Sequence, residues 1–352
     1  MPLDTASIVR VGVDLAKSVM HVHAVDAEGA TVLSRKVVRS EFLAWCSALP
    51  PGCPIGMEAS CACHYWGREL AALGLVPRLI SASFVTPYRI EGRTGKNDAN
   101  DAAAVCEAMS RPRMRFVPVK TLDQQAMLAV HTLRSGYVQD RTSCINRIRA
   151  LLAEVGLVMP SSARTFRKGI AEVITTTKHA MSPLAYAALR RAYRHFLALE
   201  KQVAWCDTAI HKHVTADPSA KVAYGIQGIG VLGASALAAT VPDMSQFKNG
   251  RQFSAWLGLV PRQRSTGGKS TLGAITRRGD GYVRKLLVLG ARNAICRASK
   301  KDDALSRWII QLRQRRGLGR AAVALANRNA RTLWRALCQR SPAANDMPLR
   351  VK

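Results

Sequence analysis

The first hundred residues alternate between apolar runs of strand length and amphipathic segments of helix length. Residues 7–14 form one apolar run. The next run alternates apolar side chains with histidines, which predicts a strand with a buried inner face and exposed outward histidines. Its alternating positions are Met20, His21, Val22, His23 and Ala24. With residues 31–38, which follow a turn at Glu28 and Gly29, these runs predict a three-stranded meander.

The rest of this region predicts helices and strands in turn. Helices are expected near residues 41–48 and 64–74, and strands at 54–60 and 76–81. An alanine-rich helix then begins near Asn97. Three strands followed by helices and strands in alternation predict a mixed sheet with flanking helices. We therefore expect an α/β fold for the N-terminal domain.

Prolines and basic residues change the composition near residues 111–118, and two long helices follow. The first is predicted within residues 121–160, where apolar side chains recur at steps of three and four residues, or sums of them, until Gly156 and Pro160. Its apolar positions are Val130, Tyr137, Cys144, Ile148, Leu151 and Val155. The second is predicted over about residues 183–214, with Leu189, Tyr193, Phe196 and Val203. The pair could form an antiparallel hairpin, either as an internal brace or as an oligomer seam.

Residues 222–241 predict a short helix, a glycine hairpin and a helix of small residues. This pattern resembles a helix-hairpin-helix, whose backbone N–H groups bind phosphate without reading bases. Gly228 and Gly230 are the candidate phosphate contacts. The alternative is a tight turn between helices that uses Ala and Gly only for packing.

The charge is distributed unevenly along the chain. There are 52 Lys and Arg against 23 Asp and Glu, a net charge of +29. Residues 1–111 hold 11 side chains of each sign, so the whole excess lies in residues 112–352. Such an excess indicates a polyanionic partner. A neutral chemistry module joined to a nucleic-acid-binding module explains the asymmetry, whereas a general need for solubility does not.

The cysteines and the hydropathy restrict the cellular setting. Nine cysteines at irregular spacings do not make a disulfide framework and fit a reduced cytosol. Cys53, Cys61, Cys63 and His64 lack the paired spacing of a structural zinc site. No run approaches the roughly 20 apolar residues of a membrane span, and the N-terminus lacks a signal-peptide pattern. We expect a soluble cytoplasmic protein that acts at the nucleoid.

Four carboxylates occupy positions that the predicted sheet could bring together. Asp14 and Glu58 end predicted strands, and Asp98 and Asp101 lie three residues apart at a helix start. Helix capping alone would account for the last two. Four converging carboxylates would repel one another unless divalent cations neutralised them, and Mg²⁺ or Mn²⁺ prefers oxygen ligands. We expect two such ions, in an arrangement suited to phosphodiester chemistry.

The order of these acids resembles the RuvC-like branch of the ribonuclease H fold. The motif VGVDLAKS also looks like the first phosphate loop of the sugar-kinase and actin superfamily. That superfamily needs a second phosphate loop and a glycine-rich adenosine site, and neither is found. The large positive charge is also unusual for a small-molecule kinase.

A second candidate for chemistry is a hydroxyl in a basic, glycine-opened loop. Ser265 and Thr266 stand before Gly267 and Gly268. The basic side chains that surround them in sequence are Arg262, Arg264, Lys269, Arg277 and Arg278. The hydroxyl could attack a phosphodiester while the cations offset the developing charge. The alternative is a loop that only contacts phosphate.

Together the motifs resemble those of the insertion-sequence transposases related to the Piv/MooV DNA invertase, the bridge-RNA-guided recombinases. They are VGVDLAKS, GMEAS, GKNDANDA, IQGIG, FSAWLGLVPRQRSTGGK and ITRRGDGYVRKLL, in order through nearly all of residues 8–300. The resemblance implies four regions. These are a RuvC-like domain (residues 1–113), a coiled-coil linker (114–217), a mainly helical transposase domain with the helix-hairpin-helix (218–340) and a flexible tail (341–352).

The same resemblance implies the mechanism and the partners. Asp14, Glu58, Asp98 and Asp101 would be the metal-binding tetrad, and Ser265 the nucleophile that forms a covalent phosphoserine link, with Thr266 a minor competitor. Donor and target DNA, a structured guide RNA and a homo-oligomer, from dimer to tetramer, are the implied partners.

Two other functions remain as alternatives. A junction-resolving nuclease of the same fold would use water, and a non-catalytic nucleic-acid scaffold would not need the carboxylates.

Overall fold

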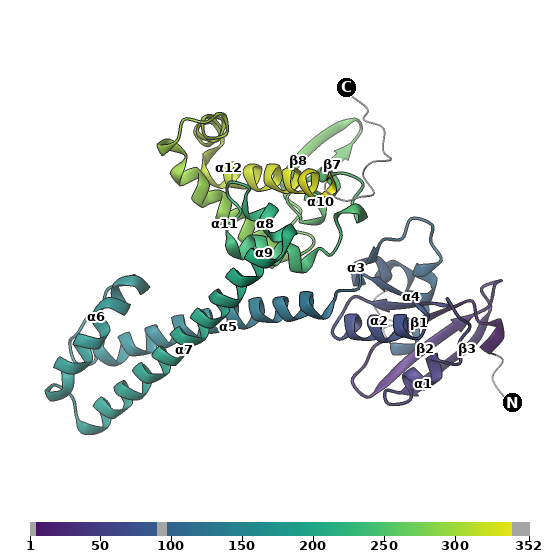
Figure 1. Ribbon diagram of the computed structural model, residues 1–352, viewed down its shortest axis with the longest axis horizontal. Coiled ribbons are helices and arrows are strands. Elements are labelled where there is room, and N and C mark those ends of the chain that lie inside the picture. Colours follow the sequence, from purple (N-terminus) through teal and green to yellow (C-terminus); the bar gives the residue numbers. More distant parts are fainter. Residues whose placement is uncertain (1–4, 90–96, 340–352) are drawn as a thin grey trace. The chain divides into compact units, whose positions relative to one another are not determined.

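The computed structural model describes residues 5–89 and 97–339 (Figure 1). The chain divides into two compact units, Met1–Thr121 and Leu122–Lys352, each with its own hydrophobic core. The expected tail, residues 341–352, lies outside the described residues. The division of the second unit into a linker and a transposase domain stays a prediction.

The first unit contains a mixed six-stranded sheet in the order β3-β2-β1-β4-β5-β6. Its strands are β1 (Arg10–Asp14), β2 (Val19–Val25), β3 (Thr31–Val38), β4 (Pro54–Glu58), β5 (Val76–Ile80) and β6 (Phe116–Val117). Strands β1, β2 and β3 are antiparallel, β1, β4 and β5 run parallel, and β6 is antiparallel to β5. The predicted meander and mixed sheet are confirmed. The two-residue strand β6 was not predicted, because it lies among prolines and basic residues.

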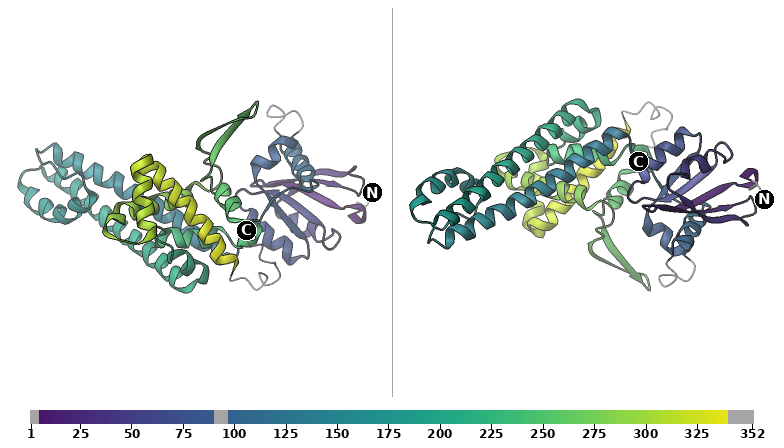
Figure 2. Two further views of the ribbon diagram at one scale, coloured as in Figure 1. Left: turned by 90° about the horizontal axis from the view of Figure 1, so that it is seen from above. Right: turned by 90° about the horizontal axis from the view of Figure 1, so that it is seen from below.

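Helices cover both faces of this sheet (Figure 2). The helices are α1 (Phe42–Cys46), α2 (Cys63–Ala72), α3 (Ala82–Val85) and α4 (Asp98–Met109), with the 3-10 turns η1 (Thr5–Ser7) and η2 (Thr86–Tyr88). Val11 and Val13 pack with α1 and α2 in one core cluster. Because side chains alternate along a strand, Gly12 faces the opposite side, where α4 lies.

Two glycines allow α4 to lie directly on the sheet. Gly12 and Gly56 are partners in the register of β1 and β4. A Cβ atom on Gly12 would lie 2.1 Å from the Ala102 carbonyl oxygen, and one on Gly56 would lie 2.5 Å from Met109 Sδ. A larger residue at Gly12 would meet helix backbone and push α4 outward, whereas one at Gly56 would have to displace the Met109 side chain. The glycine pair therefore sets the height of α4 above the carboxyl ends of β1 and β4.

The expectation that His21 and His23 are exposed is wrong. Their side chains lie partly buried beneath α4, and the side chain of His21 is only 14% exposed. The alternating pattern found the apolar face correctly. It did not show that a helix covers the polar face as well, because polar side chains can lie under a helix when they find partners there.

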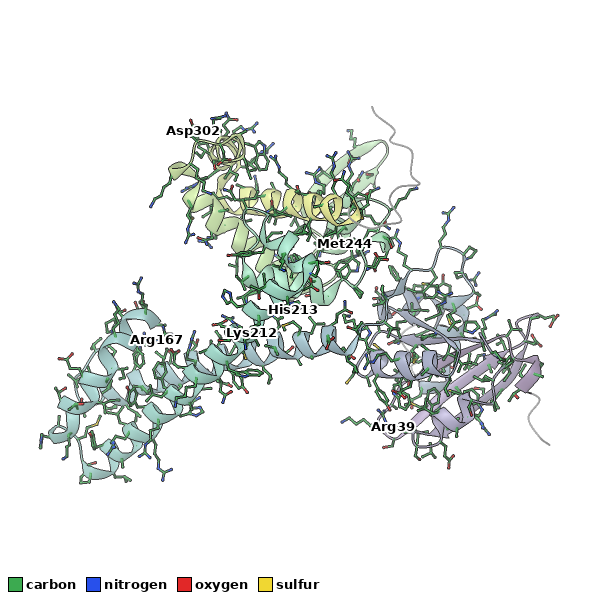
Figure 3. The ribbon with its side chains drawn as sticks, in the orientation of Figure 1. Arg39, Arg167, Lys212, His213, Met244 and Asp302 are labelled. Atoms are coloured by element: carbon green, nitrogen blue, oxygen red, sulfur yellow. The ribbon has the colours of Figure 1, made fainter. Side chains whose placement is uncertain are left out.

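The second unit contains an arm of long helices, α5 (Leu122–Ala153), α6 (Ala163–Thr176) and α7 (Pro183–Ala216), with η3 (Thr177–His179) after α6. Two ion pairs fix α5 and α7 antiparallel: Arg134 with Asp207 at 2.6 Å, and Arg141 with Glu200 at 2.9 Å. Glu200 also forms an ion pair with Arg167 of α6, which is labelled in Figure 3. The predicted helical hairpin is therefore present within one chain.

The helix register within the arm differs in part from the prediction. Cys144 and Ile148 are buried as expected, but Leu151 and Val155 are only partly buried. Ile145 and Leu152 take the buried positions instead. The reason is α6, which was not predicted: its Phe166, Ile170 and Ile174 pack on α5 and α7 and rotate the buried stripe toward themselves.

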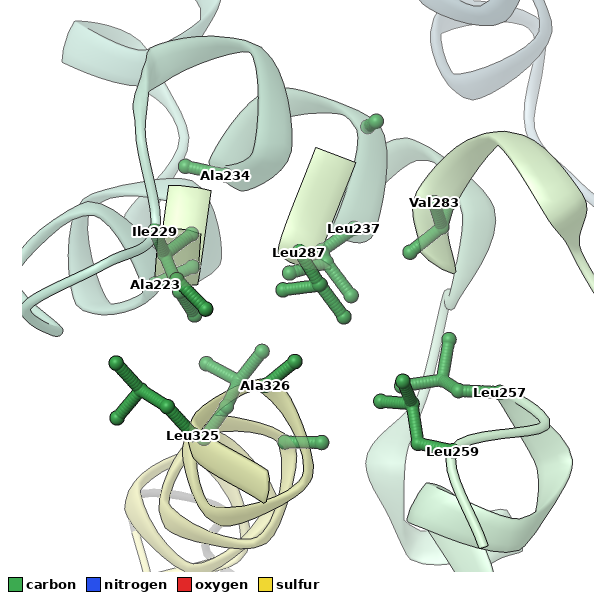
Figure 4. Close-up of a cluster of buried hydrophobic side chains, with 14 of the residues drawn as sticks. Ala223, Ile229, Ala234, Leu237, Leu257, Leu259, Val283, Leu287, Leu325 and Ala326 are labelled. Carbon is green, nitrogen blue, oxygen red and sulfur yellow. The ribbon is translucent and has the colours of Figure 1, made fainter. Parts of the chain in front are cut away.

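The remaining helices of the second unit form its main core. They are α8 (Pro218–Tyr224), α9 (Val231–Thr240), α10 (Gly250–Trp256), α11 (Gly281–Arg297) and α12 (Ala304–Cys338), with η4 (Met244–Gln246) and η5 (Ala298–Lys300). Figure 4 shows side chains from these helices meeting in one apolar cluster. A kink at Gly317, where φ is 75°, divides α12. The strands β7 (Pro261–Thr266) and β8 (Lys269–Ile275) form a separate ribbon.

A buried polar network joins the arm to this core. His131 of α5 lies 2.9 Å from both the Tyr282 hydroxyl and the Ser235 hydroxyl, and His213 of α7 also contacts Ser235 at 2.9 Å. Burial, together with His213 and Arg134, lowers the pKa of His131 to about 4. His131 is thus neutral at physiological pH and can donate one hydrogen bond and accept another.

The close approach of α4 is tested by a pair of glycine substitutions. Gly12→Ala should lower the free energy of unfolding by about 3 kcal/mol, because the new methyl group meets helix backbone that cannot move without repacking. Gly136 lies in α5, and a Cβ atom added there would have no neighbour within 4 Å. Gly136→Ala should therefore raise the free energy of unfolding by up to about 1 kcal/mol. Urea unfolding followed by circular dichroism measures both. Equal effects at the two positions would contradict the packing described.

Candidate active site

Two of the four acids meet because β1 and β4 are parallel neighbours. Asp14 is the last residue of β1 and Glu58 the last of β4. Alternation along each strand puts both side chains on the face of Gly12 and Gly56, toward α4. The strand order and the glycine pair therefore bring these carboxylates to one edge of the sheet.

The other two acids lie in the first turn of α4. Asn97 caps this helix, and its side-chain oxygen accepts a hydrogen bond from the Asn100 N–H at 2.8 Å. Capping is thus the role of Asn97, and Asp98 and Asp101 are free for other contacts. Asp101 is buried, with 6% of its surface exposed, whereas the Asp98 side chain is 63% exposed and lies 3.5 Å from His21 Nε2.

Arg89 stands between two of these acids. Its Nη2 lies 3.3 Å from Glu58 Oε1, and its Nε lies 2.5 Å from Asp101 Oδ1. The second contact is an ion pair without the alignment of a hydrogen bond, so Asp101 Oδ1 is a buried oxygen that accepts none from the described residues. One guanidinium group thus offsets part of the charge of two of the four carboxylates.

The electrostatics of Asp14 reflect the charges of the other three acids. Burial raises the pKa of the Asp14 carboxyl above its usual range. The negative charges of Asp101, Asp98 and Glu58 raise it further, in that order, and only His21 acts in the opposite direction. Such mutual repulsion, with a buried oxygen that lacks a donor, is the setting in which a hard divalent cation fits. The four oxygen donors match the preference of Mg²⁺ and Mn²⁺.

The acids as they stand do not already surround a cation. Across residues 5–89 and 97–339, no three His, Cys, Asp or Glu side chains are grouped closely enough to hold one ion. Arg89 contacts both Glu58 and Asp101 in this arrangement.

Ser265 lies on a β-ribbon and not in an irregular loop. It is the fifth residue of β7 and pairs with Ser270 of β8. Gly267 and Gly268 form the two-residue turn with φ of 56° and 76°, as the favoured hairpin turn requires. All of β7 is exposed, and the ribbon extends away from the helices of its unit (Figure 2).

The two faces of this ribbon differ in chemistry. Gln263 Nε2 donates to Ser265 Oγ at 3.0 Å and to Ser270 Oγ at 3.1 Å, so these three side chains share one face. By alternation and register, the other face carries Arg262, Arg264, Thr266 and Lys269. In the structure, therefore, the Ser265 side chain is not surrounded by Arg262, Arg264 and Lys269. It also separates Thr266 from Ser265.

Arg277 and Arg278 lie at the base of the ribbon on a tightly packed turn. Arg277 has a φ of 56°, a left-handed conformation that is unfavourable for a residue with a side chain. Its N–H donates to the Gly258 carbonyl at 3.2 Å, and a Cβ atom on Gly279 would lie 1.9 Å from the Trp256 carbonyl. The backbone of α10 and its following turn thus hold the two exposed arginines in place.

The glycine hairpin after α8 is partly explained by packing. Gly228 has a φ of 93°, and a Cβ atom there would lie 3.0 Å from Asn329 Nδ2. Gly230 is the N-cap of α9 with nothing within 4 Å of an added Cβ atom. Gly228 therefore has a packing requirement of its own, whereas Gly230 is exposed, and phosphate binding by either remains a prediction.

Comparison with known proteins decides the family. Residues 11–156 match the DEDD-type IS110 transposase model, and residues 220–307 match the model described as "Transposase IS116/IS110/IS902 family". A probable family 20 transposase of Pseudomonas aeruginosa is 45% identical over 326 residues, 92% of this chain and 95% of the relative. This chain belongs to the IS116/IS110/IS902 family of transposases.

Two further relatives carry insertion-sequence names. The transposase of IS1111A from Coxiella burnetii is 36% identical over 92% of this chain and 88% of its own. The transposase of IS1328 from Yersinia enterocolitica is 36% identical over 93% of this chain and 96% of its own. The RuvC-like character of the first domain is in accord with this family. None of the helices described is long and apolar enough to cross a membrane.

Two side chains of this transposase were missed by sequence reasoning. Arg89 contacts two of the acids, and Gln263 contacts the candidate serine. Arg89 had no signal, because a lone arginine after a 3-10 turn is ordinary. Gln263 could have been found, since two glycines between segments of strand length predict a hairpin in which residues two apart share a face.

The raised pKa of Asp14 predicts a pH-dependent gain in stability on removing its charge. The folded state favours the neutral carboxyl, so ionised Asp14 lowers the free energy of unfolding. The full loss applies at pH values above the folded-state pKa. It disappears as the pH falls through that pKa toward the ordinary value of 3.8. Asp14→Asn should therefore melt about 1–3 °C higher near pH 8 in EDTA. Below pH 4 the two proteins should melt together.

Glu28→Gln is the matched control, since Glu28 is exposed in the β2–β3 turn. Scanning calorimetry across the pH range measures all three proteins. A lower melting temperature for Asp14→Asn at pH 8 would contradict the repulsion inferred for the four acids.

Proposed function

We propose that this transposase cuts and rejoins DNA through a covalent phosphoserine intermediate. Ser265 is the nucleophile, and Asp14, Glu58, Asp98 and Asp101 are the divalent-metal ligands. The observation that carries the proposal is the convergence of four carboxylates from two strands and one helix at a single edge of a RuvC-like sheet. In a family of transposases, such a cluster is best explained by phosphodiester chemistry.

The acids supply the first half of the proposed chemistry. Asp14 and Glu58 would hold Mg²⁺ or Mn²⁺ from the strand ends, and Asp98 and Asp101 from the first turn of α4. For this Arg89 must leave Glu58 and Asp101, after which its guanidinium group is free to contact a phosphate. A bound divalent cation polarises the scissile phosphate and offsets the charge that develops on it.

Ser265 supplies the second half. Its Oγ accepts a hydrogen bond from Gln263 and thus keeps its own proton free to be given up. As the Oγ–P bond forms, one P–O bond of the strand breaks, and the leaving sugar oxygen takes up a proton in place of the one that Ser265 loses. The number of phosphodiester linkages is unchanged, so rejoining needs no external energy source.

The arginines near the ribbon suit binding of the strand that is attacked. Arg277 is kept in a left-handed conformation, and strain of this kind is found most often at functional sites. The ribbon face opposite Ser265 carries Arg262, Arg264 and Lys269. We assign these side chains to contacts with neighbouring phosphates of the nucleic-acid backbone. Gly228 and Gly230 would contact backbone phosphates through the helix-hairpin-helix.

We further propose that a structured RNA guides the reaction and that the working form is a dimer to tetramer. The RNA is inferred from the family resemblance alone, which points to an RNA from the element itself; the charge excess of residues 112–352 suits a polyanionic partner of either kind. In such an assembly the acids and the serine could come from different subunits. Sequence reading would then be done by base pairing, and the protein would recognise backbone and shape.

The central experiment uses a suicide DNA substrate that cannot be religated, presented with Mg²⁺ and the non-coding RNA of the element. Wild-type protein should become trapped on DNA, and peptide mapping should place the adduct on Ser265. Ser265→Ala should lose at least about 99% of the adduct yet bind nucleic acid almost normally, because one hydroxyl adds only about 1 kcal/mol to binding. Leaving out the RNA should abolish trapping.

Thr266→Ala is the matched control, because Thr266 is one residue away on the opposite face of the ribbon. It should keep the adduct. An adduct retained by Ser265→Ala and lost by Thr266→Ala would move the role to Thr266. Released DNA ends without an adduct in any variant would favour the water-using nuclease, and trapping without RNA would exclude guidance.

A further inference from the structure

The first unit has a cleft of about 630 Å³ at the edge of the face covered by α1 and α2. Its lining includes Ser18, Arg39, Ser40, Tyr65 and Trp66. The cleft plays no part in the cleavage chemistry proposed above. We propose that it binds one unpaired nucleotide of a nucleic-acid strand that reaches the acids, an inference that rests on the proposed function.

The cleft lies at the same end of the sheet as the acids. Ser18 is in the turn that leads from Asp14 into β2, and Arg39 follows the last residue of β3. Tyr65 is in the first turn of α2, which begins five residues after Glu58. The lining residues thus come from chain segments that adjoin the ends of β1, β3 and β4. The acids lie on the α4 side of this end and the cleft on the side of α1 and α2, so a strand must pass around this end of the sheet to reach both.

The position and charge of the Arg39 side chain suit the binding of a phosphate. Its backbone N–H donates to the Ser18 carbonyl and its Nη1 to the Ala16 carbonyl, both at 3.0 Å. Its guanidinium carbon lies 4.9 Å from the centre of the Trp66 ring. Within the described part of the chain it makes no ion pair with a carboxylate. The charge is therefore fixed in place and uncompensated, and a guanidinium fork of this kind suits phosphate oxygens.

The exposure of the Tyr65 ring suits stacking with a nucleic-acid base. Its side chain is 43% exposed, and its ring meets that of Trp66 edge to face with the centroids 5.0 Å apart. Part of the ring is thus open to solvent, while the contact with Trp66 limits the orientation of the side chain. Bases of single strands stack on such aromatic side chains, and paired bases inside a duplex cannot. The chemistry therefore selects an unpaired nucleotide.

The backbone that carries Tyr65 is also specialised. Ala62, in the turn between Glu58 and α2, has a φ of 65°, the left-handed region that is unfavourable for alanine. The Ala62 carbonyl accepts the Trp66 N–H at 3.1 Å. This strained turn links a proposed metal ligand at one end to the aromatic pair at the other. Strain held in this way is typical of binding sites.

Photocrosslinking tests the cleft without requiring catalysis. The full-length protein is irradiated with single-stranded oligonucleotides that carry 5-iodouracil, which crosslinks to aromatic rings on which it stacks. One arm uses DNA and the other RNA of the same sequence. We expect an adduct on Tyr65 in the tryptic peptide 40–68 from at least one arm, and the arm that yields it identifies the strand. A fully paired duplex should give none.

Three variants make the assignment specific. Tyr65→Leu should lose the adduct and Tyr65→Phe should keep it, while Arg39→Gln should lower its yield about tenfold, since the phosphate partner is removed. Phe84→Leu is the matched control, because Phe84 is 42% exposed in the same unit but does not line the cleft. It should leave the Tyr65 adduct unchanged. Thermal melting confirms that each variant is folded.

The outcomes separate this inference from the proposed function. No adduct on Tyr65 from either arm, or an equal adduct from the duplex, would overturn the nucleotide site, whatever the result at Ser265. A Tyr65 adduct that persists in proteins unable to form the Ser265 adduct would support the site and leave the serine mechanism to its own test.

Discussion

The contact between α4 and the two central parallel strands is the constraint on which the rest of the first unit depends. Gly12 lets the helix backbone rest on β1, and Gly56 leaves room on β4 for the Met109 side chain. The height of the helix then decides where Asp98 and Asp101 lie. This arrangement is costly, because four carboxylates share one edge and, among the residues that the structure describes, Arg89 is the arginine that contacts them. This cost accords with the proposal that the acids hold a divalent cation. A divalent cation is the ligand that their oxygen donors suit.

The same contact explains why stability and function oppose each other here. Ionised Asp14 is held in a setting that favours its neutral form, so the folded protein is less stable than it would be with a neutral side chain there. Arg89 reduces the repulsion but cannot remove it, because it reaches only Glu58 and Asp101. Enzymes commonly tolerate such local strain where the chemistry requires it.

Much of the fold could be predicted because it depends on local patterns. The alternation of Met20, Val22 and Ala24 gave the inner face of β2, and the apolar spacing predicted the two long helices. The sequence could not show which elements cover the second face of a strand or helix. The partial burial of His21 beneath α4 and the rotation of the buried stripe by α6 are both tertiary effects that no single segment encodes.

The candidate site shows the same limit. The positions of the four acids followed from strand ends and a helix start, whereas Arg89 required the fold. At the ribbon, adjacency in sequence suggested that arginines surround Ser265. The strand period separates them instead, because neighbours along a strand point to opposite faces. Gln263, two residues from the serine, is the partner that the register selects.

Titration of the metal-free protein with MnCl₂, followed by calorimetry in two buffers, tests most directly whether the acids form a cation site. The account predicts saturable binding that is lost in Asp101→Asn but kept in Glu107→Gln, which changes a partly exposed acid of the same helix. It also predicts proton release on binding, which increases as the pH is lowered, because the cation must displace the proton favoured by Asp14. Binding that is absent, or that is equally strong in Asp101→Asn, would contradict it.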